Sequence, residues 1–190
     1  WVYWFSSEPV YTPEDLKKSK IFTWAGDYKS SQLYEKHGYQ SVPLAITDVL
    51  SGLQTGLINT LGFNPMYTLS QQLFGIADNM LDMKWGNLTA AIVIDNRTWN
   101  RIKPEHQSMM LDIAQNIGNG FQKKNRHETN KAIDVMKKYG LTVNTPTPVQ
   151  VKKWEDLIQR MYPDLRGSLL DEVTFDRLME IKKEMDSHSN

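Results

Sequence analysis

The 190-residue chain contains no cysteine. This absence excludes disulfide bonds, a thiol nucleophile and zinc sites built on cysteine, and it suits an oxidising compartment. No apolar run approaches the roughly 20 residues that a membrane-spanning helix needs, so no spanning segment is predicted. Basic and acidic side chains balance at 22 each. The charge therefore indicates no polyanionic partner and argues against nucleic acid as the ligand.

Patterns that would support catalysis are also missing. The four histidines, His37, His106, His127 and His188, have no metal-ligand spacing with one another or with carboxylates. The sequence has no Gly-x-Ser-x-Gly turn and no phosphate-binding loop. The glycines at 118 and 120 lie within a predicted helix, where they do not indicate a dinucleotide site. We therefore expect no enzyme activity, no metal and no cofactor.

What the sequence does contain is an alternation of strand and helix patterns through residue 95. This alternation predicts an α/β fold with a largely parallel sheet covered by helices. We expect strands at 1–6, 20–24, 39–42, 57–61, 80–84 and 88–94, and helices at 12–18, 30–37, 47–55 and 65–76. Thr47 is the expected N-cap of the third helix, and Gly56 is expected to end it.

A long helical pattern over residues 104–139 then breaks the alternation. Met110, Ile113, Ile117 and Phe121 lie on one face of this predicted helix. Two glycines near its middle, at 118 and 120, predict a kink. A short strand at 141–143 and helices at 149–161 and 173–185 complete the prediction.

Three segments of the sequence have a pattern in common with a known family. The first comprises Pro43, Ala45, Thr47, Asp48, Val49, Leu53, Gln54, Thr55 and Gly56; the second is residues 9–17, Pro-Val-Tyr-Thr-Pro-Glu-Asp-Leu-Lys; the third runs from Ala91 to Trp99. Their order and spacing resemble the signature of solute-binding proteins of tripartite ATP-independent periplasmic (TRAP) transporters, the DctP-like family.

The resemblance implies a two-lobed fold of the periplasmic-binding-protein-like type II class, with the long kinked helix spanning both lobes. In that picture residues 1–90 form a ligand-binding lobe. Residues 91–145 supply a crossing strand, the long helix and a strand to the other, largely missing lobe, and residues 146–190 pack as helices across the two. Because the chain opens directly on an aromatic strand, we expect it to be the C-terminal portion of a longer protein.

Ligands of α/β proteins lie outside the carboxyl ends of the strands, which directs attention to the residues that follow each strand. Trp24 and Asp27 follow the strand at 20–24, Asn64 follows the strand at 57–61, and Trp85 follows the strand at 80–84. Core packing, turn formation or helix capping would also explain each of them. We nevertheless predict that these four residues, with Phe22, contact the ligand.

One departure from the family concerns the anchor for the solute. Many members have an arginine that clamps a substrate carboxylate at the position occupied here by Phe22. The resemblance therefore implies a small organic solute, such as a carboxylate or an aromatic compound, without the usual anchor. Two possibilities stay open: an apolar or aromatic acid held by another group, or an uncharged solute stacked on Trp24 and Trp85.

The main hypothesis is a periplasmic receptor that closes its lobes on a solute and delivers it to the permease subunits of a TRAP transporter in the membrane. One alternative is an enzyme that uses the same cleft. Another is a protein-interaction module, in which the long polar helix and the aromatic strand serve a partner protein. Exposure of Trp1, Tyr3 and Trp4 by truncation would instead favour self-association over function.

Overall fold

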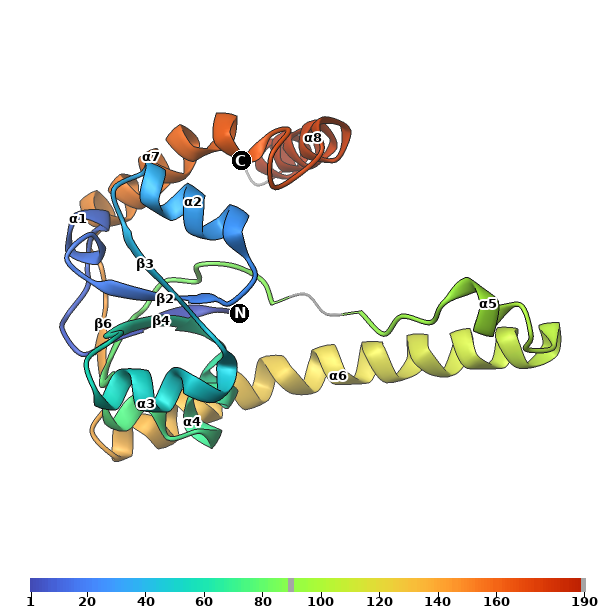
Figure 1. Ribbon diagram of the computed structural model, residues 1–190, viewed down its shortest axis with the longest axis horizontal. Coiled ribbons are helices and arrows are strands. Elements are labelled where there is room, and N and C mark those ends of the chain that lie inside the picture. Colours follow the sequence, from blue (N-terminus) through green and yellow to red (C-terminus); the bar gives the residue numbers. More distant parts are fainter. Residues whose placement is uncertain (89–90, 189–190) are drawn as a thin grey trace.

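The computed structural model describes residues 1–88 and 91–188 and shows one six-stranded sheet with helices on both faces (Figure 1). The strand order is β3-β2-β4-β1-β5-β6. The strands are β1 (Tyr3–Ser6), β2 (Lys20–Trp24), β3 (Gln40–Leu44), β4 (Thr60–Phe63), β5 (Asn79–Leu81) and β6 (Thr142–Asn144). The α/β class predicted from the alternation is confirmed.

The sheet is mixed, because one strand runs against its neighbours. β2 pairs in parallel with β3 and β4, and β5 pairs in parallel with β6. β1 is antiparallel to both β4 and β5, with Phe5 opposite Leu61 on one side and Met80 on the other. The amino end of β1 therefore lies at the same edge as the carboxyl ends of β2 and β4.

The helices cover both faces of the sheet. They are α1 (Pro13–Leu16), α2 (Tyr28–Lys36), α3 (Val49–Gln54), α4 (Pro65–Ser70), α5 (Asn96–Trp99), α6 (Pro104–Lys138), α7 (Pro148–Leu165) and α8 (Glu172–His188), with 3₁₀ turns η1 (Ile46–Asp48) and η2 (Leu73–Gly75). Capping boxes begin two of them: Thr12 with Asp15 at α1, and Thr147 with Gln150 at α7. The first of these signals is the one that predicted the start of α1 from the sequence.

Alternate residues of β1 divide the core into two clusters, as the period of a strand requires. Tyr3 and Phe5 face the cluster formed with α3, α4 and the carboxyl-terminal part of α6. Trp4, between them, faces the cluster formed with α1 and α7, which contains Trp154. Tyr3 and Trp4 are 6% and 2% exposed. The exposure of Tyr3 and Trp4 that would favour self-association is therefore absent.

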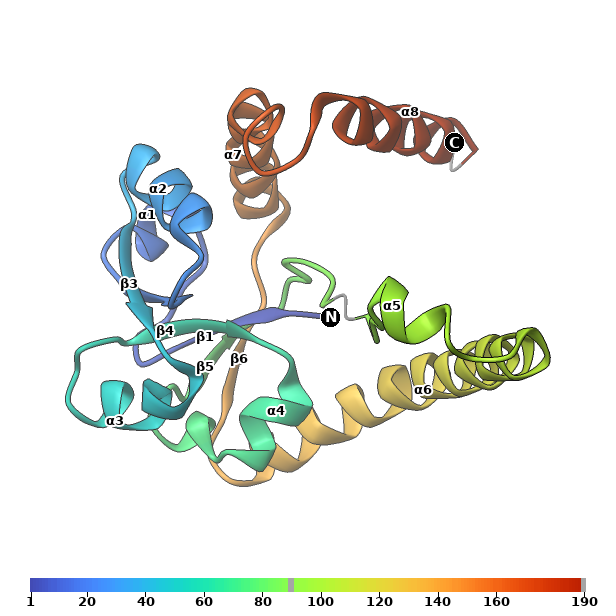
Figure 2. The ribbon, with the colours of Figure 1, turned by 45° about the vertical axis from the view of Figure 1, so that its right-hand side comes forward.

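Helix α6 extends far beyond the sheet, and α5 lies beside its distant end (Figures 1 and 2). Gln107 of α6 donates to the Trp99 carbonyl of α5 at 2.8 Å, which holds the two together. The predicted apolar face of α6 is exposed along this extension, and Ile117 and Phe121 are 63% and 64% exposed.

Three local predictions are wrong in detail. Thr47 does not cap a helix: it lies within η1, and α3 starts after it without a side-chain cap. Helix α6 is continuous through Gly118 and Gly120, and Figure 1 shows no sharp bend there. The described residues 88 and 91–94 form no strand. Ile92, in that segment, is 99% exposed, so no neighbouring strand supplies the hydrogen bonds that a strand needs.

Helices of the length and apolarity required to cross a membrane do not occur in the described part of the chain. The same residues contain no group of three or more His, Cys, Asp or Glu side chains arranged to hold a metal ion.

Candidate functional site

A cavity of about 400 Å³ opens at the edge of the sheet where β2 and β4 end and β1 begins. Four of the five residues predicted from the sequence line it: Phe22, Trp24, Asp27 and Trp85. They come together because parallel strands end at one edge and because antiparallel β1 starts there.

Strand β2 contributes Phe22 and Trp24 to the cavity lining, and both pack against Phe63 of β4, which does not line it. Phe22 is 5% exposed and packs between Trp24 and Phe63, with ring centroids 5.4 Å and 5.3 Å away. Trp24 is 49% exposed, and its ring also meets Phe63 at 6.0 Å, nearly perpendicular. Phe22 and Phe63 thus fix the Trp24 indole while half of its surface stays accessible. An indole held in this way offers a flat face on which a solute can stack.

Trp85 reaches the cavity through a backbone bridge to the start of the chain. The Val2 amide donates to the Gly86 carbonyl at 2.8 Å, and the Trp85 amide donates to the Val2 carbonyl at 2.9 Å. The Trp85 ring then packs 5.4 Å from Trp4 and 5.5 Å from Trp154. Its position depends on β1 and α7, which are distant from it in sequence.

Helix α2 forms the remaining wall and supplies the charged group. Asp27 is the N-cap of α2, and its Oδ1 accepts a hydrogen bond from the Ser30 amide at 3.1 Å. Ser30 and Tyr34, on the same side of the helix, also line the cavity. Burial raises the pKa of Tyr34 to about 12; a hydrogen bond from Trp85 lowers it, and the negative charge of Asp27 raises it. Tyr34 is therefore a neutral hydroxyl at physiological pH.

Asn64, the fifth predicted residue, does not line the cavity. Its Oδ1 accepts from the Met66 amide at 2.8 Å, which makes it the N-cap of α4. Its Nδ2 donates weakly to the Trp1 carbonyl at 3.5 Å. Helix capping, which was one of the alternatives for Asn64, is therefore the role that the structure shows for this side chain.

The sequence did not predict the other lining residues, which are Val2, Trp4, Thr23, Ser30, Tyr34, Gly62, Gly86 and Asn87. The Trp4 ring lies against Gly62, where a Cβ would come within 3.3 Å of Cζ3, so only glycine fits without a shift. Alternation along residues 1–6 could have shown that Trp4 faces away from Tyr3 and Phe5. No local signal showed which strand β1 joins.

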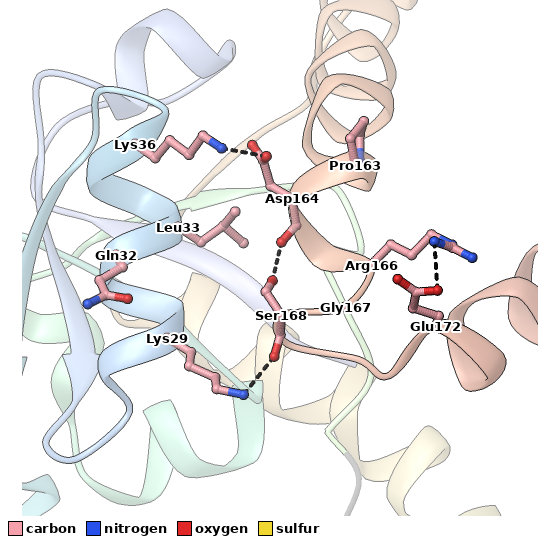
Figure 3. Close-up of a pocket in the computed structure, with 10 residues that line it drawn as sticks. All are labelled: Lys29, Gln32, Leu33, Lys36, Pro163, Asp164, Arg166, Gly167, Ser168 and Glu172. Carbon is pink, nitrogen blue, oxygen red and sulfur yellow. Dashed lines mark hydrogen bonds and ion pairs between the residues drawn. The ribbon is translucent and has the colours of Figure 1, made fainter.

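A second cavity, of about 530 Å³, lies between α2 and the connection from α7 to α8 (Figure 3). Two lysines of α2 contact the C-terminal segment across it. Lys36 pairs with Asp164 at 2.6 Å, and Lys29 donates to the Ser168 carbonyl at 2.6 Å. The two lysine contacts join α2 to the C-terminal segment, and we interpret this cavity as structural. Within that segment, Arg166 pairs with Asp176 of α8 through two hydrogen bonds of 2.8 Å.

Comparison with known proteins identifies the fold and the family of this chain. The sequence matches the family described as "Bacterial extracellular solute-binding protein, family 7" (DctP) over residues 1–167. It is 27% identical over 163 residues to the 2,3-diketo-L-gulonate-binding periplasmic protein YiaO of Escherichia coli, covering 86% of this chain and 46% of that protein.

Two solved structures show the same fold. The periplasmic ectoine-binding protein of the TeaABC TRAP transporter of Halomonas elongata superposes with a TM-score of 0.78 at 20% identity, covering 86% of this chain and 54% of that one. A TRAP periplasmic solute-binding protein of Desulfovibrio salexigens, with bound orotic acid, gives a TM-score of 0.81 at 16% identity, covering 96% and 58%.

The chain spans about half the length of these relatives. The fold class expected from the sequence, a periplasmic-binding-protein-like fold that is incomplete, is therefore confirmed. Because the family match extends over residues 1–167, the chain belongs to the bacterial extracellular solute-binding proteins of family 7, the DctP family.

Proposed function

We propose that this chain carries one ligand-binding lobe of a solute receptor that serves a TRAP transporter. The observation that carries the proposal is the aromatic cavity at the carboxyl edge of β2 and β4. Its volume of about 400 Å³ falls within the range of roughly 300–1,000 Å³ that small-molecule sites occupy. The names of the relatives, which include binding proteins for diketogulonate and ectoine, support a small organic solute.

The proposed binding mode follows from how the cavity is built. Trp24 and Trp85 stack on the solute, Phe22 supports Trp24 from below, and Asp27 and Asn64 supply polar groups, Asn64 once the cleft is closed. The second lobe covers the solute from the open side. A solute that contacts both lobes binds the closed form more tightly than the open one, and this difference drives closure.

We propose a division close to the one expected from the sequence, with a ligand-binding lobe at 1–90, helices that pack across both lobes at 146–190, and a change within the middle segment at 91–145. The exposed apolar side chains of α6, such as Ile117 and Phe121, support a covering lobe over its extension. β6, at the end of the middle segment, pairs with β5. We therefore assign only the part before the carboxyl-terminal half of α6 to the second lobe.

The proposed location is the periplasm, and the proposed partners are the permease subunits of the transporter. Support comes from the relatives, which are named as periplasmic proteins of such transporters. Delivery, in this account, requires that the permease recognise the closed receptor and open it.

Trp24→Ala tests the proposal in the full-length protein. We expect binding of an identified solute to weaken by about 1–3 kcal/mol, because the stacking face is lost. Isothermal titration calorimetry measures the change, after a thermal-shift screen has identified the solute. Tyr28→Ala is the matched control, since Tyr28 is 73% exposed and does not line the cavity. Equal affinities of the two variants would remove Trp24 from the site.

A further inference from the structure

The charge distribution of the cavity points to a class of solute. Among the described lining residues the only formal charge is the carboxylate of Asp27, and no Lys, Arg or His side chain is present. Trp24 and Trp85 also line the cavity with partly exposed rings, whereas the lining residues Trp4 and Phe22 are buried in the two core clusters. Aromatic ring faces are electrically negative, so the rings and the carboxylate act in the same direction.

Asp27 is placed to use its charge on a ligand. Its Oδ1 accepts a hydrogen bond from the Ser30 amide as the cap of α2, and that is the one hydrogen bond of the Asp27 side chain to the described residues. Its Oδ2 is therefore available to a donor in the cavity. The side chain is partly exposed. An ammonium or amidinium group on a bound solute would form a charge-assisted hydrogen bond there.

A solute carboxylate finds the opposite environment in this lobe. Phe22 is 5% exposed and packed between Trp24 and Phe63, so β2 offers an apolar ring where a cation would be needed. The remaining polar groups, such as the Ser30 hydroxyl, are uncharged. A carboxylate placed here would lose its hydration beside Asp27 without gaining an opposite charge.

We propose that this lobe contacts the positively charged part of its solute, an ammonium, quaternary or amidinium nitrogen held between Asp27 and the face of Trp24. The proposal rests on the receptor function proposed above. It extends to zwitterions, whose carboxylate then faces the second lobe. It excludes purely anionic solutes as the preferred ligands.

The test uses the full-length protein and a panel of small solutes that differ in charge. Ectoine, glycine betaine and 1-methylnicotinamide carry a cationic nitrogen, nicotinamide is neutral, and nicotinate, orotate and L-malate are anions. Thermal-shift measurements identify the solutes that raise the unfolding midpoint, and calorimetry gives their affinities. We expect 1-methylnicotinamide to bind more tightly than nicotinate, which has a similar ring and the opposite charge.

Two variants on α2 then assign the effect. Asp27→Asn keeps an acceptor for the cap and removes the charge, and we expect it to weaken binding of the cationic solutes by about 10- to 100-fold. Glu35→Gln removes the same charge from the same helix outside the cavity and should change the affinity less than about twofold. Circular dichroism melting of both variants checks that α2 remains folded.

The outcomes separate this inference from the receptor function. Preferential binding of the anions, or equal affinities of Asp27→Asn and Glu35→Gln for the cationic solutes, would overturn the charge preference and leave the receptor function intact. Failure of every solute to bind would overturn both.

Discussion

Trp154 connects the C-terminal helix α7 to the candidate site, and its replacement is the most informative perturbation of the fold. The side chain is 1% exposed, and its Nε1 donates to the Tyr11 carbonyl at 2.9 Å. Its ring meets Trp85 edge to face at 5.5 Å. Trp154→Phe keeps a ring but leaves the Tyr11 carbonyl without this donor, which costs about 1–3 kcal/mol. Trp154→Ala also leaves a cavity and should cost about 3–5 kcal/mol.

Urea denaturation followed by circular dichroism measures both losses as free energies of unfolding. Trp1→Phe is the control, because Trp1 is 41% exposed and its replacement should change stability by no more than about 0.5 kcal/mol. Trp154→Ala also removes one support of Trp85, so solute affinity should fall together with stability. A Trp154→Phe variant as stable as Trp1→Phe would refute the role of the hydrogen bond, and a Trp154→Ala variant as stable as Trp1→Phe would refute the role of the packing.

Two further predictions concern the C-terminal tether and the glycines. Hydrogen bonds from Lys36 and His37 lower the pKa of the Asp164 carboxyl. Because the folded pKa lies below the unfolded value of 3.8, the stabilisation is present above pH 3.8 and disappears as the pH falls through the folded pKa. Asp164→Asn should therefore lower the urea midpoint at pH 7 and have little effect near pH 2. Equal losses of stability at both pH values would contradict this prediction. Gly56→Ala should destabilise the protein by about 1–2 kcal/mol, because Gly56 has the left-handed φ of +70. Gly118→Ala in α6, with open space around it, should stabilise the protein by about 0.5–1 kcal/mol. A Gly118→Ala variant less stable than Gly56→Ala in urea denaturation would refute this reading of the two backbone positions.

Features that depend on a few neighbouring residues could be predicted from the sequence. The start of α1 follows from Thr12 and Asp15, and the end of α3 follows from Gly56. The grouping of Phe22, Trp24 and Trp85 followed from a general rule about strand ends, which requires only that the strands lie in one sheet.

Features that depend on pairing between distant segments could not be predicted. The antiparallel direction of β1 brought Trp4 into the cavity, and nothing in residues 1–6 specifies its partners. The segment at 88–94 has the composition of a strand, but composition does not show whether a neighbouring strand is present to pair with it. In the structure Ile92 is exposed. Asn64 shows a different limit: the same amide can cap a helix or contact a ligand, and the capping role takes its Oδ1 here.

The two sides of α2 explain why the C-terminal helices matter to a site that they do not line. Asp27, Ser30 and Tyr34 recur at the spacing of one helical face and line the aromatic cavity. Lys36 and Lys29 lie on another face and contact Asp164 at the end of α7 and Ser168 just after it. A shift of α7 would therefore move α2, and with it the carboxylate of Asp27 relative to Trp24. Replacement of Asp164, which holds α2 to α7, should consequently change solute affinity as well as stability, although Asp164 does not line the aromatic cavity.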